Sequence, residues 1–402
     1  MKAGVASTTY SGSQQPHSPN GTGLGVSDGS SRILIGATEE IVKGGLRAMF
    51  QVDFRVRIDD NGGTADNNAN GSLGRRTTAW NASQLGTGNT FIGIADSWGM
   101  IRIGKLDTHY CAGSDQHGSR ATALQASSCG LLGYVNGSGA GNAIANASRS
   151  TNIINYVSPT IQGFVLGLSH STAWQGNTFW APDAAANASL YGQTGSEGPL
   201  DSQGKGGAMN VRLDYANGPI KAGASWWDAT GENKAMGTNP TVANEVRYRR
   251  SAQEGLTVYG DYNFGMGSIG LTWDKSSTSS AAQNAGFLKS ERTVVSVPVT
   301  LKVGGPGTLI GTWSRASDID RSGAVTATAP AGSAAGTGAT LISIGYNHDL
   351  SKRTSLGINY AKMNNGANGS YGFYTQTSLA GHTVPVAGQD QEQYYIGLRH
   401  TF

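Results

Sequence analysis

The side chains that could do chemistry in this chain are cationic groups on one face of an alternating segment, 46–57. Arg47, Arg55 and Arg57 share that face with Asp53, and an unbroken apolar row occupies the opposite face. Successive side chains of a strand point to opposite faces, so the segment predicts a strand with water on one side. Stacked guanidinium groups need water and anions to screen them, and rows of cations favour the passage of anions. The chemistry indicated is electrostatic attraction of anions.

Catalytic and metal-binding patterns are weak by comparison. The sequence has no Gly-x-Ser-x-Gly, no His-Glu-x-x-His and no phosphate-binding loop. His109, Asp115 and His117 could suggest a metal site, but two histidines eight residues apart in a Gly- and Ser-rich stretch are better explained as solvated loop residues. We predict no enzymatic activity, no metal and no cofactor.

Composition excludes several classes of protein. The 402 residues include 60 glycines, only 14% are charged, and no run approaches the 18 apolar residues of a membrane-spanning helix. A transmembrane barrel remains possible, because lipid-facing and lumen-facing residues alternate and average to a polar composition. The net charge of +3 comes from dispersed lysines and arginines, so a nucleic-acid partner is not predicted.

Alternating segments recur along the chain and predict an all-β fold of about 16 strands. The last segment, 392–402, places Tyr394, Ile396, Leu398 and Phe402 on one face and mostly polar residues on the other. Its length matches a tilted strand that crosses a bilayer, about 9–11 residues. Proline cannot donate to a ladder, so Pro298 inside the candidate strand 290–303 predicts a bulge or a shifted boundary.

Long polar stretches separate many of these strands, and aromatic residues cluster near the strand ends. The aromatic positions predict two girdles at the membrane interfaces. One stretch, about 107–148, holds both cysteines, Cys111 and Cys129, for which a single disulfide in an oxidising compartment is the favoured state. The remaining long loops are expected at about 11–30, 59–74, 171–206, 229–253, 317–338 and 364–390.

Several stretches resemble the strands and turns of Gram-negative outer-membrane porins, most of all those of beta-proteobacteria. They are Ser31-Arg32, Thr38-Glu39-Glu40, Gly45 to Gln51, Arg149 to Pro159, Asp349 to Thr354, and Glu392 to Phe402. The resemblance implies one barrel domain over 1–402, with the 107–148 segment folded into the lumen as a constriction loop. It also implies a homotrimer in the bacterial outer membrane, surrounded by lipid and lipopolysaccharide. The terminal strand would be read by the barrel-assembly machinery.

The start of the chain, Met1 to Val5, has no apolar stretch behind its lysine, so a signal peptide is removed or absent. Because the porin family opens with an aromatic-Gly half-strand before a stretch like Ala3-Gly4-Val5, Met1 is expected to lie inside the first strand.

The resemblance also places a basic constriction wall at Arg32, Lys105 and Arg149. Lys105 shares parity with the apolar Ile101 and Ile103, so a bulge or a strand end must turn it inward. Inward parity adds four arginines to this wall: Arg47, Arg55, Arg57 and Arg102.

Acidic residues are expected across the pore, and the loop that carries them is poor in acids. Asp107 and Asp115 would face the basic wall and create a transverse field that orients polar solutes. A disulfide between Cys111 and Cys129 would stiffen the loop, and the alternative is two free buried thiols.

The predicted function is passive diffusion of small hydrophilic solutes and ions, with a modest anion preference. Two alternatives remain open. A substrate-selective anion channel would show saturable flux or block by a particular anion. A structural or adhesion barrel that only displays surface loops would show no conductance.

Overall fold

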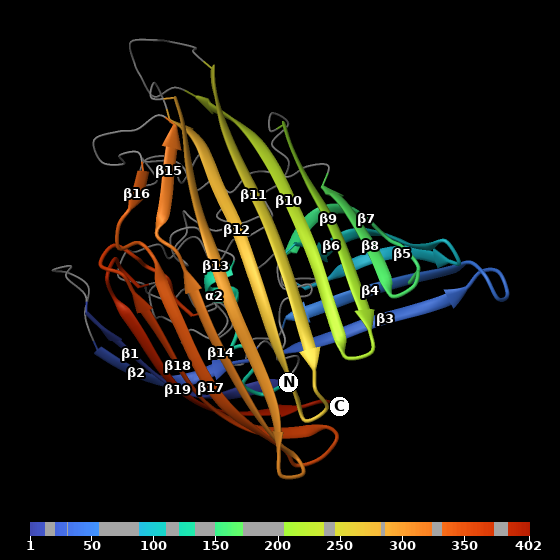
Figure 1. Ribbon diagram of the computed structural model, residues 1–402. Coiled ribbons are helices and arrows are strands. Elements are labelled where there is room, and N and C mark those ends of the chain that lie inside the picture. Colours follow the sequence, from blue (N-terminus) through green and yellow to red (C-terminus); the bar gives the residue numbers. More distant parts are fainter. Residues whose placement is uncertain are drawn as a thin grey trace.

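The computed structural model describes residues 1–12, 21–29, 31–55, 88–109, 120–132, 149–171, 205–236, 246–282, 286–323, 332–373 and 385–402. These residues form one 19-stranded sheet, in which every paired strand is antiparallel, and one short helix, α2 (Cys129–Leu132). Figure 1 shows the long strands β9 to β14 side by side, tilted and curving round the interior of the molecule. None of the described helices is long and apolar enough to cross a membrane.

The nineteen strands reduce to sixteen, the predicted number, when segments that follow each other after a short break are counted together: β2 with β3, β14 with β15, and β16 with β17. The bounds are β1 (Lys2–Ser11), β2 (Gly21–Asp28), β3 (Arg32–Glu40), β4 (Arg47–Arg55), β5 (Thr90–Asp96), β6 (Gly99–Asp107), β7 (Arg149–Val157), β8 (Phe164–Ser171), β9 (Lys205–Asn217), β10 (Ile220–Met236), β11 (Val246–Asn263), β12 (Gly267–Ala282), β13 (Gly286–Val303), β14 (Gly307–Ala316), β15 (Ile319–Gly323), β16 (Gly332–Ala334), β17 (Ala339–Asp349), β18 (Thr354–Asn365) and β19 (Asp390–His400).

The first and last strands pair directly. β1 and β19 run antiparallel over ten residue pairs, from Lys2 opposite Arg399 to Ser11 opposite Asp390. The amino group of Met1 extends this contact by donating to the carbonyl of His400 at 2.6 Å. The two ends of the chain therefore join the sheet to itself along β1.

The strand faces are reversed relative to a water-soluble sheet. In β19, Tyr394 and Ile396 are more than half exposed, whereas Gln393 and Tyr395 are buried. Apolar side chains thus point outward and polar ones inward, as expected where lipid covers the outside and water the inside. The predicted faces of the terminal strand are confirmed, although β19 ends at His400, two residues before the predicted end.

Pro298 does not produce the expected bulge or shifted boundary. The register between β12 and β13 is the same on both sides of it, with Ile269 opposite Val299 and Thr272 opposite Ser296. Pro298 itself pairs in register with Thr312 of β14. The prediction was wrong because the missing N–H interrupts the ladder only on the β12 side, and the long paired stretches on either side keep the register.

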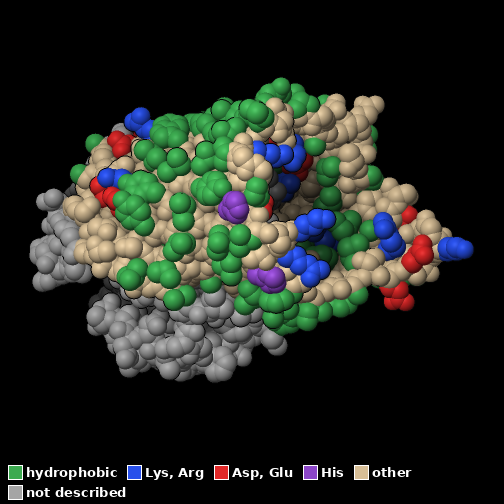
Figure 2. Space-filling model, turned by 90° about the horizontal axis from the view of Figure 1, so that it is seen from below, with side chains coloured by type: hydrophobic (Ala, Val, Ile, Leu, Met, Phe, Trp, Pro, Cys, Tyr) green, Lys and Arg blue, Asp and Glu red, His purple; other side chains and the backbone are tan. Residues whose placement is uncertain are grey.

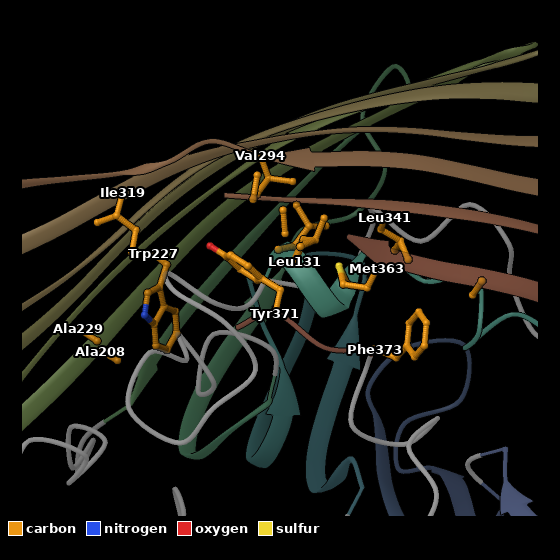
Figure 3. Packing of buried hydrophobic residues seen from close by; sticks show 14 residues of the cluster. Leu131, Ala208, Trp227, Ala229, Val294, Ile319, Leu341, Met363, Tyr371 and Phe373 are labelled. Carbon is orange, nitrogen blue, oxygen red and sulfur yellow. The ribbon is translucent and has the colours of Figure 1, made fainter. Parts of the chain in front are cut away.

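An apolar cluster fills part of the interior, which is otherwise lined by polar side chains. Leu131 and Leu132 of α2 pack with Tyr371, Phe373 and inward-facing residues of the wall (Figure 3). The wall contributes Ala208, Trp227, Ala229, Val294, Ala316, Ile319, Ala339, Leu341, Ala361 and Met363, which belong to β9, β10, β13 to β15, β17 and β18. The segment that carries α2 is therefore folded into the lumen, against one side of it.

Candidate functional site: the pore lining and its constriction segment

Arg102 of β6 lies on the inward face, between two outward isoleucines. Its Nε and Nη2 donate to the side-chain oxygen of Asn155 at 3.0 and 2.7 Å. Its guanidinium also lies over the ring of Phe91, 5.2 Å from the centroid. These partners are neutral, so they orient the arginine without cancelling its charge. The predicted inward direction of Arg102 agrees with this geometry.

Arg212 of β9 is a second inward cation, which sequence reasoning missed. Its Nε lies 2.6 Å from the carboxylate of Asp214, and the Tyr259 hydroxyl donates to the same carboxylate. The signal was present in the sequence, because Arg212 and Asp214 alternate with the apolar Val211 and Leu213 along the strand. Seen from below, Lys and Arg side chains gather around the hollow of the molecule (Figure 2).

The ladder is irregular at Lys105, where the prediction requires it. The β6–β7 register shifts between Gly104 and Leu106, so two residues of β7 face Lys105. One of them, Asn152, has a φ of 55°, and Gly104 has a φ of 149°. Both values lie in the region that ordinary residues avoid, so the local twist is built into the backbone.

Asp107 and Arg149 lie opposite each other at the end of the same ladder. Asp107 is fixed by Asn89, whose amide nitrogen donates to its carboxylate at 2.8 Å and whose amide oxygen accepts from the Asp107 backbone N–H at 2.9 Å. The structure describes the backbone but not the side chain of Arg149. Asp115, which was predicted to act together with Asp107 as an acidic pair, lies outside the described residues.

The arginines of the β3–β4 hairpin are divided between its two ends. Arg32 is 3.7 Å from the buried carboxylate of Asp53 and lies opposite Arg55 in the ladder. Arg47 pairs with Glu40 beside the turn, eight positions away from Arg55, which is roughly 26 Å along a strand. Arg57 is outside the described residues. Arg32 and Arg55 are thus brought together, and Arg47 is not brought to them.

A buried ion pair fastens the inserted segment to the wall. This segment is the predicted loop 107–148, described over 107–109 and 120–132, and is called the constriction segment below. Arg292 of β13 and Asp274 of β12 are 2.6 Å apart, and both side chains are fully buried. The other guanidinium nitrogen, Nη2, donates to the carbonyls of Leu131 and Leu132 at 2.6 Å each. These carbonyls lie at the C-terminal end of α2, where unsatisfied acceptors favour a cation. Arg292 therefore links the wall to the segment inside the lumen.

His109 provides a second attachment, at the start of the segment. Its Nδ1 lies 2.8 Å from the Ser225 hydroxyl, and its Nε2 lies 3.3 Å from the Thr257 hydroxyl. Thr257 in turn donates to Asp274 at 2.6 Å. Burial lowers the pKa of His109 to about 4, against a smaller opposing effect of Asp274. The imidazole is therefore neutral at physiological pH.

The middle of the segment is held at Thr122. Its backbone N–H donates to the Asn347 side-chain oxygen at 3.2 Å, and the Asn347 amide nitrogen donates to the Thr122 hydroxyl at 2.7 Å. Cys129 is disulfide-bonded. Cys111, the other cysteine of the sequence, lies outside the described residues, as does His117. Within the described ranges, no group of three or more His, Cys, Asp or Glu residues could hold a metal.

Comparison with known proteins gives a consistent result. A family model described as Gram-negative porin matches residues 2–368. Outer membrane porin protein 32 of Delftia acidovorans is 24% identical over 383 residues, which cover 94% of this chain and 87% of that protein. The solved anion-selective porin from Comamonas acidovorans has a TM-score of 0.59 at 21% identity, covering 100% of this chain and 99% of that one. The trimer form of in-vitro folded OmpT from Vibrio cholerae has a TM-score of 0.56 at 14% identity, covering 100% and 98%.

The fold and the lumen with an inserted segment define the class as a transmembrane β-barrel channel. The chain belongs to the Gram-negative porin family. It is a passive channel of the bacterial outer membrane, as the sequence predicted.

Proposed function

We propose that this porin is an anion-preferring diffusion pore for small hydrophilic solutes, that it works as a homotrimer, and that it carries no catalytic activity. The observation that supports the anion preference most directly is Arg102. It is an inward cation whose direct contacts, the Asn155 amide and the Phe91 ring, leave its charge in place.

The position of the apolar cluster adds to this argument. The constriction segment and Tyr371 pack on β9, β10, β13 to β15, β17 and β18. Water and ions pass more readily along polar walls than along apolar ones, so the aqueous path is expected along the opposite wall. That wall is formed by β3 to β8 and includes Arg32 and Arg102, and Arg212 lies at its border, on β9.

The expected preference is modest, because acids form ion pairs with two of the three arginines, and Asp107 acts on the third, Arg102, without direct contact. Arg212 shares its charge with Asp214, and Arg32 with Asp53. One uncompensated charge about 5 Å from a passing ion in water is worth about 0.8 kcal/mol, which is roughly a fourfold preference. The anion-selective porin among the similar structures supports the sign of this preference.

The trimer is proposed from the outer face of the first strands. Ile33, Ile35 and Phe50 are between 44% and 52% exposed and form an apolar surface on β3 and β4. One structural relative was solved in a trimer form. We propose that Phe50, Val52 and Phe54 pack against neighbouring protomers, and that lipid covers the outward faces of the remaining strands.

Swelling of liposomes that contain the refolded trimer tests the proposed function. Solutes of matched size but negative, zero or positive charge are compared, with empty liposomes as the control. The proposal expects all three to enter, with the anion fastest by a few-fold. Saturation by one anion alone would instead favour a substrate-selective channel. Entry of none, from a folded trimer, would refute a diffusion pore and favour a barrel that displays loops.

A further inference from the structure

A cavity of about 610 Å³ lies on the outer side of the barrel wall, where β13, β14, β17 and β18 come together. The side chains that matter here are Thr293, Trp313, Arg315, Thr340 and Asn364. It is distinct from the pore lining described above.

Strand alternation shows that the cavity faces away from the lumen. Ser314 and Ala316 are buried on the inner side, whereas Trp313, which has the opposite parity, is 41% exposed. Val294 belongs to the interior apolar cluster, so its neighbour Thr293 points to the other face. The cavity therefore opens on the surface that lipid covers in a porin.

The ends of the surrounding strands show where the cavity lies along the barrel axis. β14 ends at Ala316, β18 ends at Asn365 and β17 begins at Ala339, all beside the cavity. The opposite ends of β17 and β18 are joined by a short turn, Asp349 to Thr354. Short turns are periplasmic in porins, so the cavity lies near the extracellular surface. Tryptophan favours the membrane–water interface, which places Trp313 at headgroup depth.

Arg315 differs from the other cations of this outer surface. Lys275, Lys289 and Lys362 each lie within 2.8 to 3.9 Å of a glutamate oxygen. Within the described part of the chain, Arg315 has no carboxylate within ion-pair distance. The acid of the cavity is Asp318, whose Oδ1 accepts from the backbone N–H of Gly338 at 2.7 Å. Arg315 is thus presented in the cavity without an ion-pair partner among the described residues, while the carboxylate of Asp318 is engaged by the backbone.

We propose that this cavity binds a phosphorylated lipid of the outer leaflet. The guanidinium of Arg315 would hold the phosphate by two parallel hydrogen bonds, the geometry for which arginine is suited. Hydroxyl groups of Thr293 and Thr340 and the amide of Asn364 are placed to bond the remaining headgroup oxygens. Trp313 would pack along the first part of an acyl chain.

The test is native mass spectrometry of the refolded trimer in neutral detergent, titrated with bisphosphorylated lipid A. Arg315→Gln is the test variant and Arg315→Lys the conservative one. Arg353→Gln is the matched control, because Arg353 is an exposed arginine in the turn at the opposite end of β18. Since Arg315 is exposed, folding should be unaffected, and unchanged conductance and heat-dependent gel mobility verify this.

The expected result is one lipid A per protomer, with binding about tenfold weaker in Arg315→Gln, partly restored in Arg315→Lys and unchanged in Arg353→Gln. The inference is overturned if Arg315→Gln and Arg353→Gln bind like the wild type. It is also overturned if dephosphorylated lipid A binds equally well, or if inorganic phosphate competes as strongly as the lipid. None of these outcomes depends on ion selectivity, so the result is separable from the proposed anion preference.

Discussion

Replacing Arg292 by methionine should release the constriction segment from the wall while the barrel stays folded. The substitution removes the bond to Asp274 and the two bonds to the carbonyls of Leu131 and Leu132. It leaves a fully buried carboxylate without its cation. The barrel itself is held by ladders that do not involve this side chain, so the cost falls on the inserted segment.

The magnitude follows from the burial of the pair. Removing one partner of a buried ion pair costs roughly 3–5 kcal/mol, because the other charge stays buried and uncompensated. At about 1.4 kcal/mol for each factor of ten, the detached population of the segment should rise at least a hundredfold. Replacing both charges, Arg292→Met with Asp274→Asn, should cost less than Arg292→Met alone, because no bare charge then remains.

Single-channel recording of refolded trimers measures this effect. The Arg292→Met channel should show greater open-state current noise and closure at lower voltage than the wild type, and the double variant should lie between them. Arg315→Met is a matched control, since Arg315 belongs to the outer face. Noise and closure like the wild type in a folded Arg292→Met trimer would refute the anchoring role of this arginine.

Three further predictions concern the same pore. Because burial lowers the pKa of His109 to about 4, below the ordinary value of about 6.5, the unfolded chain binds the proton first. The contribution of this residue to stability should therefore be lost as the pH falls from about 6.5 to 4, and acid-induced closure in that window should shrink in His109→Gln; equal closure in both proteins would contradict this. Reducing the disulfide of Cys129, or replacing Cys111 and Cys129 by serine, should raise channel noise. A disulfide that closes a loop of about 19 residues stabilises the ordered loop by roughly 3 kcal/mol, and this contribution is lost on reduction. Channel noise that does not respond to reductant would contradict a stiffening role for the disulfide. Arg102→Gln should lower the anion-to-cation permeability ratio by about fourfold or less, whereas Arg353→Gln should not change it; a ratio that stays constant in Arg102→Gln would remove the main support for the basic wall.

Much of the barrel follows from a single physical rule. Two-residue alternation with the apolar side outward gave the strand number, the faces of β19 and the inward direction of Arg102. The same rule also indicated the ladder irregularity at Lys105, because a cation in an apolar row needs a backbone defect to leave it.

The anchors of the constriction segment could not be predicted in this way. Arg292 and Leu131 are 161 residues apart, and nothing local in either segment indicates the contact. Alternation could, however, have revealed the apolar side of the lumen. Trp227, Val294 and Leu341 have inward parity, and a large apolar residue in an otherwise polar row signals that something packs on it.

The reversal potential of the wild-type trimer in a planar bilayer under a salt gradient tests the central claim most directly. The proposed trimer predicts current steps in groups of three. The basic wall predicts a reversal potential on the anion side, corresponding to a permeability ratio of a few-fold. A reversal potential on the cation side, from the same three-step channels, would contradict the proposal that Arg102 and its neighbours set the selectivity.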